Sequence, residues 1–307
     1  MKSYSAADII RLLPYDLMAR ELPRRLAQPA STPPRHVHTL AQDGEPDASL
    51  LLMPAWGHEI GGVKIVNVTP GNAKRRLPAV TASYLLFDTL TGEHLALLDG
   101  GELTARRTAA VAAIAADRLA ADSARRLLLI GSGRIASELA FAYRAVRSID
   151  QVRVFSPTHA NAQKLARALS AGGFDATPTE DLATAQDWAD IIACATLSHE
   201  PWVRGASLRP GQHVALIGGY LPDMREGDDL VMSRGQVWVD TCAALNEAGD
   251  LSGPIASGAL TVDAIRGDLS ELCAQGRQAD RKDAITVFKS VGEAAQDLAA
   301  AGLAVGR

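Results

Sequence analysis

The chain has 307 residues, of which 47% are hydrophobic and 21% charged, and a formal net charge of -4 at pH 7. This composition is typical of a soluble globular protein, and the length predicts two domains. The slightly acidic balance gives no indication of a nucleic acid or membrane partner, and no apolar run reaches the ~20 residues of a membrane span. We therefore expect a soluble, cytoplasmic protein.

The cysteines and the first residues agree with that location. Cys194, Cys242 and Cys273 are widely spaced and form no metal-ligand pattern, so we expect reduced thiols and no metal site. Asp8 stands where a signal peptide would need its apolar stretch.

The first part of the chain predicts two helices, then an antiparallel sheet, then a long helix. Capping residues at 5–8 precede helical apolar spacing over 9–13, and a second helix is expected over 15–26. Strands are expected at 35–40, 49–56, 61–68, 79–88 and 93–99, with a basic loop at 69–78. An alanine-rich helix follows over 103–121.

From Ser123 onward, strands and helices alternate, which predicts a parallel sheet. Strands are expected at 126–130, 151–155, 174–177, 190–195, 213–217 and 236–239, and helices at 134–147, 158–171, 181–187 and 223–232. After Thr241 the pattern predicts loops and short helices, then the segment 285–292 and a last amphipathic helix over 293–301.

The clearest motif lies where the first of these strands ends. Gly131, Gly133 and Ala136 follow an apolar run in the spacing G-x-G-x-x-A and open an amphipathic helix. In a dinucleotide site, such residues permit a tight turn, close approach of the pyrophosphate and close helix packing. Ordinary turns also show this spacing, but the run 151–155 follows at the distance of a βαβ unit. We therefore predict a Rossmann-type, doubly wound parallel sheet.

The end of the next strand indicates which dinucleotide is preferred. NAD-preferring folds usually place an acid there for the ribose 2′-hydroxyl, whereas this chain has Ser156, Thr158 and His159 and no carboxylate. These side chains suit a 2′-phosphate better, although no arginine accompanies them. We predict that NADP(H) is preferred over NAD(H).

Several charged residues are candidates for chemistry. Lys64 lies among β-branched residues, so it is either a partly buried cation with an anionic partner or a residue on the solvated face. Arg35, after two prolines, is either a bidentate clamp for a carboxylate or a surface residue. Arg106 and Arg107 lie near a helix start, where the dipole disfavours cations. They therefore indicate a nearby anion, unless one of them is a solvated charge.

The histidines are weaker candidates. His58, His199 and His213 belong to no recognised catalytic motif and are more typical of structural or exposed residues.

Taken together, the motifs resemble the ornithine cyclodeaminase/mu-crystallin family almost from end to end. The matching segments are Pro34-Arg35, Leu52–Trp56, Gly62–Lys64, Pro70–Asn72, Leu98–Gly100, Leu103–Ala110, Gly131–Gly133, Pro222–Glu226 and Phe288–Gly292. The resemblance implies a homodimer without a metal. It also implies a Rossmann domain over 121–287 and an α+β substrate-binding and dimerisation domain over 1–120, completed by a C-terminal helix within 288–307.

Carried over by position, the resemblance also implies the site. Arg35 and Lys64 hold the substrate carboxylate, with Lys64 also a candidate proton donor, and Tyr220 lies in the substrate site. The implied cofactor-binding residues are Arg107, Gly131, Ser132, Gly133, Arg134, Ile135, Ser156, Thr158, Thr196, Gly218, Ser290 and Val291.

One segment separates the activities of this family. Cyclodeaminases resemble Gly-Gly-Asp followed by Cys-Pro-Gly-Lys, with the aspartate as acid/base, whereas this chain has Tyr220 and Met224 in place of the aspartate and lysine. A tyrosine hydroxyl ordinarily ionises near pH ~10 and serves poorly in that role. Pro222–Glu226 instead resembles the ketimine reductases, although Gly219-Tyr220 departs from both patterns.

The resemblance therefore implies an NAD(P)H-dependent reductase of a cyclic imino acid, 1-pyrroline-2-carboxylate or 1-piperideine-2-carboxylate. Two alternatives remain at this stage. One is a lyase that cyclises ornithine and keeps NAD+ bound, and the other is a non-enzymatic binding protein that retains the cofactor contacts.

Overall fold

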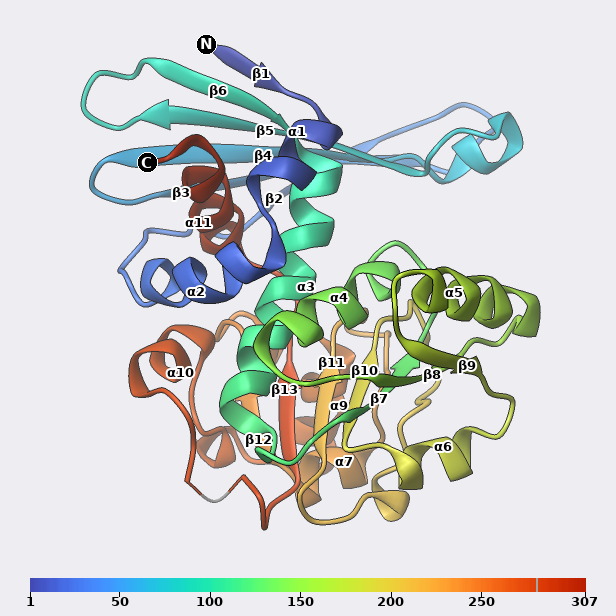
Figure 1. The fold of residues 1–307 in the computed structure, drawn as a ribbon. Coiled ribbons are helices and arrows are strands. Elements are labelled where there is room, and N and C mark those ends of the chain that lie inside the picture. Colours follow the sequence, from blue (N-terminus) through green and yellow to red (C-terminus); the bar gives the residue numbers. More distant parts are fainter. Residues whose placement is uncertain (280) are drawn as a thin grey trace. The chain divides into compact units, whose positions relative to one another are not determined.

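The computed structural model describes residues 1–279 and 281–307, which form two compact units (Figure 1). Unit 1 comprises Met1–Arg107 and Glu293–Arg307, and unit 2 comprises Thr108–Gly292. Helix α3 (Gly100–Leu119) contains the boundary at Arg107.

These boundaries differ from the expected ones at 120/121 and 287/288. The end of α3 belongs to unit 2, because Arg147 donates hydrogen bonds to the main-chain oxygens of Ala116 and Ala121. Thr286 donates another to the main-chain oxygen of Leu119. Phe288 also belongs to unit 2, because it lies on a strand that is paired on both sides in that unit's sheet.

Unit 1 is a six-stranded sheet with helices packed on it. Its strands are β1 (Lys2–Tyr4), β2 (His36–Leu40), β3 (Ala48–Trp56), β4 (Ile60–Val68), β5 (Val80–Asp88) and β6 (His94–Asp99), in the order β1-β6-β5-β4-β3-β2. The expected antiparallel pairing holds from β2 to β6. β1, which the sequence did not indicate, pairs in parallel with β6. Its three residues are strand only through that partner, since so short a run has no periodicity of its own.

The C-terminal helix covers part of this sheet. Helices α1 (Ala6–Leu12), α2 (Tyr15–Leu26) and α11 (Ala294–Val305) and the 3-10 helix η1 (Pro70–Arg75) complete the unit. α11 packs against β3, β4, β5 and α2, and Figure 1 shows it in dark red beside them. On the sheet, Lys64 of β4 lies directly opposite Tyr84 of β5, so both side chains point to the same face.

Unit 2 is a seven-stranded parallel sheet in the order β12-β13-β11-β10-β7-β8-β9. The strands are β7 (Arg126–Ile130), β8 (Gln151–Phe155), β9 (Asp175–Pro178), β10 (Ile191–Cys194), β11 (His213–Leu216), β12 (Gln236–Val239) and β13 (Thr286–Lys289). The order reverses between β7 and β10, and β13 inserts beside β11. This is the doubly wound Rossmann arrangement that the sequence predicted, in which ligands bind at the carboxyl ends of the strands at the reversal.

Helices connect most of the successive strands of unit 2. They are α4 (Ala136–Val146), α5 (His159–Ala171), α6 (Leu182–Trp188), α7 (Asp229–Arg234), α8 (Ala244–Glu247), α9 (Gly249–Ser257) and α10 (Leu269–Gln275), with η2 (Gly205–Ser207) and η3 (Val262–Ala264). α6, α7, α8 and α9 contribute to one apolar core with alternate strand residues such as Leu128 and Ile130. Leu127 and Leu129 point to the opposite face and are equally buried, as in a sheet covered on both sides.

Two sequence predictions were wrong in detail. The helix expected over 223–232 begins only at Asp229, because the Asp228 side chain caps it and the main chain at Glu226 and Gly227 donates to the Asp250 carboxylate instead. The basic loop at 69–78 contains the 3-10 helix η1, in which Lys74 and Arg75 form ion pairs with Glu45.

None of the helices found in residues 1–279 and 281–307 has the length and apolar character to cross a membrane. Within residues 1–279 and 281–307, no group of three or more histidine, cysteine and acidic side chains is arranged so that it could bind a metal ion.

Candidate active site

A buried charge cluster lies between the sheet of unit 1 and α11. Asp297 of α11 accepts from Lys64, with Nζ 2.7 Å from Oδ2, and from Arg107, with Nε 2.9 Å from Oδ1. Gln296 accepts from Arg107 Nη1 at 2.6 Å. Lys64, Arg107 and Asp297 are all nearly inaccessible to solvent. Two cations therefore share one carboxylate, so these three side chains together carry a formal charge of +1.

The environment adjusts the acidity of Lys64. Burial, opposed by Asp297, lowers the pKa of its ammonium from the usual 10.5 to about 8, and the positive charges of Arg107 and Arg35 contribute to the lowering. Asp297 keeps a pKa below the ordinary value, because Arg107 and Lys64 outweigh the effect of its burial. Lys64 is thus a cation near neutral pH that can release a proton readily.

Lys64 is buried, so the alternative that it lies on the solvated face of its strand is excluded. Both arginines of α3 are buried as well, which excludes the alternative that one of them is a solvated charge. Arg106 serves the fold: its Nε donates to the main-chain oxygen of Leu13, and its guanidinium lies 4.3 Å from the ring centroid of Tyr15. Arg35 is half-buried and precedes β2.

The carboxyl end of β7 in unit 2 has the geometry of a phosphate-binding turn. Gly131 has φ +112°, and a Cβ there would lie 2.4 Å from the main-chain oxygen of Ala195, so only glycine fits. A Cβ on Gly133 would meet no protein atom within 4 Å. The fold does not itself require glycine at 133, which leaves open space in front of the N-terminus of α4, the feature that a pyrophosphate needs.

The neighbouring strand end supplies hydroxyl groups. Ser132 Oγ lies 3.0 Å from Ser156 Oγ, just beyond β8. Thr158 is the N-cap of α5, yet its side chain makes no capping hydrogen bond. Arg134 forms an ion pair with Glu138 one helical turn further on, and Ile135 is the N-cap of α4.

The other predicted cofactor residues lie at neighbouring strand ends. Thr196 follows β10 and Gly218 follows β11, and a Cβ on Gly218 would lie 1.8 Å from the main-chain oxygen of Thr196, so the two backbones are in contact. Ser290 and Val291 follow β13, where the Asp240 carboxylate accepts from Ser290 Oγ and from the Val291 amide. The structure thus brings these residues to the carboxyl ends of the parallel strands, the side of the sheet on which a ligand binds where the strand order reverses.

Sequence reasoning missed the buried carboxylates. Asp297, Asp240 and Asp250 each bind residues that had been singled out or their neighbours, but no local motif marks them; Glu226 was named only as the last residue of the family segment Pro222–Glu226. The signal available was the run Glu293–Asp297, in which polar residues interrupt an otherwise apolar helix.

The histidines behave as expected for structural or surface residues. His213 is buried at the amino end of β11, where its Nδ1 lies 3.0 Å from Thr286 Oγ1, and burial together with Arg147 lowers its pKa to about 3. His58 and His199 are exposed.

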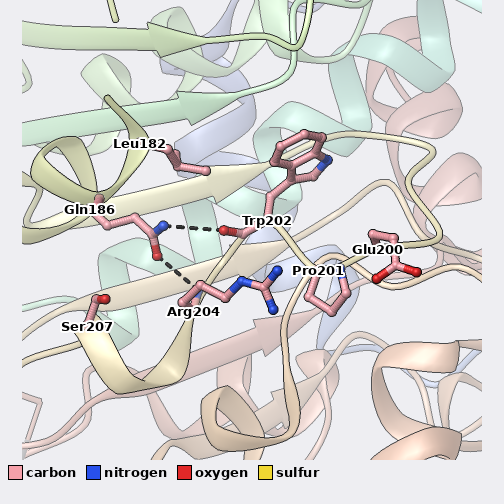
Figure 2. A pocket seen from close by; sticks show the side chains of 8 residues that line it. Leu182, Gln186, Glu200, Pro201, Trp202, Arg204 and Ser207 are labelled. Atoms are coloured by element: carbon pink, nitrogen blue, oxygen red, sulfur yellow. Dashed lines mark hydrogen bonds between the residues drawn. The ribbon is translucent and has the colours of Figure 1, made fainter. Parts of the chain in front are cut away.

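A separate pocket of about 330 Å³ lies beside α6. Figure 2 shows Gln186 hydrogen-bonded to the main chain of Trp202 and Arg204 at its wall. Its two charged side chains, Glu200 and Arg204, have opposite signs. None of the predicted site residues lines it, and it lacks the excess positive charge that a pyrophosphate would need.

With this geometry established, comparison with known proteins decides the family. The model of the ornithine cyclodeaminase/mu-crystallin family matches residues 7–305. The chain belongs to this family. The resemblance found in the motifs is therefore confirmed, as is the Rossmann-type fold.

Individual members of the family are similar over nearly their whole length. Delta(1)-pyrroline-2-carboxylate reductase of Paracoccus denitrificans is 39% identical over 275 residues, which are 86% of this chain and 87% of that protein. The structure of Thermococcus litoralis Delta(1)-pyrroline-2-carboxylate reductase with NADH and L-proline is 32% identical, with a TM-score of 0.91 over 100% of this chain and 97% of that one. An archaeal alanine dehydrogenase dimer with bound NAD is 26% identical, with a TM-score of 0.89 over 100% and 95%. A nicotinamide cofactor is thus supported for this family member.

Proposed function

We propose that this protein is an NAD(P)H-dependent reductase of cyclic imino acids, which converts 1-pyrroline-2-carboxylate or 1-piperideine-2-carboxylate to L-proline or L-pipecolate. The observation that carries the proposal is the buried cluster in which Lys64 and Arg107 share Asp297. Such a cluster attracts a small carboxylate, and the turn at Gly131–Gly133 suits a dinucleotide. The named activity of the similar reductases supports the same substrate class.

The residues of unit 1 have separate tasks in this reaction. Arg35 and Lys64 bind the substrate carboxylate; Asp297 occupies one of the three Lys64 N–H donors, which leaves two for a ligand. A nicotinamide cofactor, held at the turn Gly131–Gly133, would supply the hydride that the imine carbon requires. Lys64, with a pKa of about 8, gives a proton to the imine nitrogen near neutral pH, and the carbon–nitrogen double bond becomes an amine. In unit 2, Tyr220 is half-buried after β11, and its role as a substrate-binding residue stays a prediction.

The test of the function is a pair of parallel assays. Purified protein with a cyclic imine and NADPH should oxidise the cofactor, followed by its absorbance. The same protein with L-ornithine and NAD+ should release no ammonia, because Tyr220 stands where cyclodeaminases have an acid/base aspartate. Ammonia release at ordinary enzymatic rates without imine reduction would contradict the proposal.

The cofactor preference is proposed to be NADP(H), on the strength of Ser156 and Thr158 and the absence of a carboxylate just after β8. Ser156→Asp should then shift the ratio of kcat/KM toward NADH by ~10-fold or more, because a carboxylate accepts from the 2′-hydroxyl and repels the 2′-phosphate. Ser170→Asp, exposed near the other end of α5, is the matched control and should leave the ratio unchanged. A wild-type enzyme that already strongly prefers NADH would refute this assignment.

The acidity of Lys64 predicts how ligand affinity depends on pH. Lys64 carries its charge below a pKa of about 8 and loses it as the pH rises through that value. Affinity for pyrrole-2-carboxylate, a planar anion without a titrating amine, should therefore be constant at lower pH and fall up to ~10-fold per pH unit above it. Calorimetry across the range measures this, and Lys64→Arg, which keeps its charge, should flatten the curve. An unchanged curve in Lys64→Arg would exclude Lys64 as the titrating group.

We also propose a homodimer with a contact through unit 1. The edge strand β2 is exposed along its whole length, with Val37 57% and Leu40 39% accessible. An unpaired edge with apolar side chains is a natural place for a second copy. Light scattering on the purified protein should give twice the chain mass, and a monomer at micromolar concentration would contradict this.

A further inference from the structure

The least expected group in unit 2 is the side chain of Glu226, which is completely buried. Its Oε1 accepts from the main-chain amide of Thr196 at 2.7 Å and from Thr196 Oγ1 at 3.0 Å. Its Oε2 accepts from the amides of Gly218 at 2.7 Å and Gly219 at 3.3 Å. One carboxylate therefore joins the residues that follow β10 to those that follow β11.

A second layer fixes Glu226 itself. Asp250, at the start of α9, accepts from the amides of Glu226 at 2.7 Å and Gly227 at 3.0 Å. Its other oxygen pairs with Lys289 Nζ at 2.7 Å, and that ammonium lies 3.8 Å from Glu226 Oε2. Two carboxylates thus share one lysine, and all three side chains are shielded from solvent. Buried charges of this kind are costly as a means of stability alone, since packed apolar side chains would serve as well.

The residues that donate hydrogen bonds to Glu226 lie at the carboxyl ends of the parallel strands, which is where a sheet of this type binds a dinucleotide. The adenosine half of a dinucleotide lies toward the strand after the glycine-rich turn, which is β8 in this chain. The nicotinamide half would therefore extend over the ends of β10 and β11, where Thr196 and Gly218 are in backbone contact. A small change in the spacing of these two strand ends would move the backbone groups that line the nicotinamide half of the site.

We propose that Glu226 is a positioning residue for the nicotinamide half of the cofactor, acting through Thr196 and Gly218. The inference rests on the proposed function, because it requires a bound dinucleotide. It assigns a role to the segment Pro222–Glu226, which distinguishes this chain from the cyclodeaminase pattern but whose side chains have so far no part in the reaction. The carboxylate works because it is an acceptor only, so all four donors converge on it without conflict.

The variant Glu226→Gln tests this with minimal change of shape. An amide can accept on one atom only, and its NH2 group would face donors at the other position. We expect the dissociation constant for NADH and NADPH to rise ~10-fold or more, with KM for the cofactor rising more than kcat falls. Affinity for ADP, which lacks the nicotinamide half, should stay within ~2-fold of wild type. Glu200→Gln, an exposed glutamate of the same unit, is the matched control for all three ligands.

The outcomes separate the possible explanations. Equal loss of NADH and ADP affinity would indicate a general disturbance of the unit and overturn the positioning role, and so would unchanged NADH affinity. If Glu226→Gln fails to fold, Asp250→Asn is the second variant, because it weakens the contact that holds the Glu226 main chain. It should give the same selective loss of NADH affinity. Equal losses of NADH and ADP affinity in Asp250→Asn would again overturn the inference. A wild-type protein that binds no dinucleotide at all would instead refute the proposed function.

Discussion

Lys64→Ala should lower kcat/KM for the cyclic imine by ~10² or more, the largest effect on activity that we expect from one substitution. The side chain is buried, and loss of one member of a buried charge pair typically costs ~2–5 kcal/mol. The same change removes the proton donor, so kcat should fall as well as affinity. Initial rates over a range of imine concentrations separate the two effects, and Arg35→Ala should act mainly by raising KM.

The control for this experiment is Lys74→Ala, which removes an exposed lysine of the same unit. It should leave both kinetic constants and the melting temperature near those of the wild type. Near-normal kinetics in both Lys64→Ala and Arg35→Ala would place the substrate elsewhere. A Lys64→Ala protein that unfolds at a much lower temperature would have to be assayed below its own transition.

Asp297→Asn should produce the largest loss of stability. The substitution keeps the shape of the side chain but leaves Lys64 and Arg107 as buried cations without their shared carboxylate. Breaking a buried ion pair in this way typically costs ~3–5 kcal/mol, which denaturant unfolding measures directly. Asp43→Asn, in an exposed turn, is the matched control and should change the free energy of unfolding by no more than ~0.5 kcal/mol.

The same variant carries a second readout that stability alone would not change. The charge of Asp297 raises the pKa of Lys64, so its removal should lower that pKa further. The decline in affinity for pyrrole-2-carboxylate should then begin at a lower pH than in the wild type. A decline at the wild-type pH, despite a clear loss of stability, would mean that Asp297 stabilises unit 1 without tuning Lys64.

Part of this protein follows from local sequence patterns. The strand, glycine turn and helix at 126–146 were predictable, because apolar runs, a glycine at positive φ and helical spacing each act over a few residues. The alternation of strands and helices likewise fixed the parallel sheet of unit 2. The presence of Tyr220 where cyclodeaminases have an aspartate was also recognisable from the sequence, because it requires only alignment with a family motif.

The tertiary structure decided which charges meet. Asp297 lies 233 positions along the chain from Lys64 and 190 from Arg107, yet it is the partner of both. No periodicity links such distant residues, because the contact exists only once α11 packs on β4. The same reason explains Glu226, whose carboxylate joins two strand ends that lie 30 and 8 positions from it in the sequence. Local patterns determined the elements and the nucleotide turn, whereas long-range packing alone placed the anions that orient the cationic site and the strand ends.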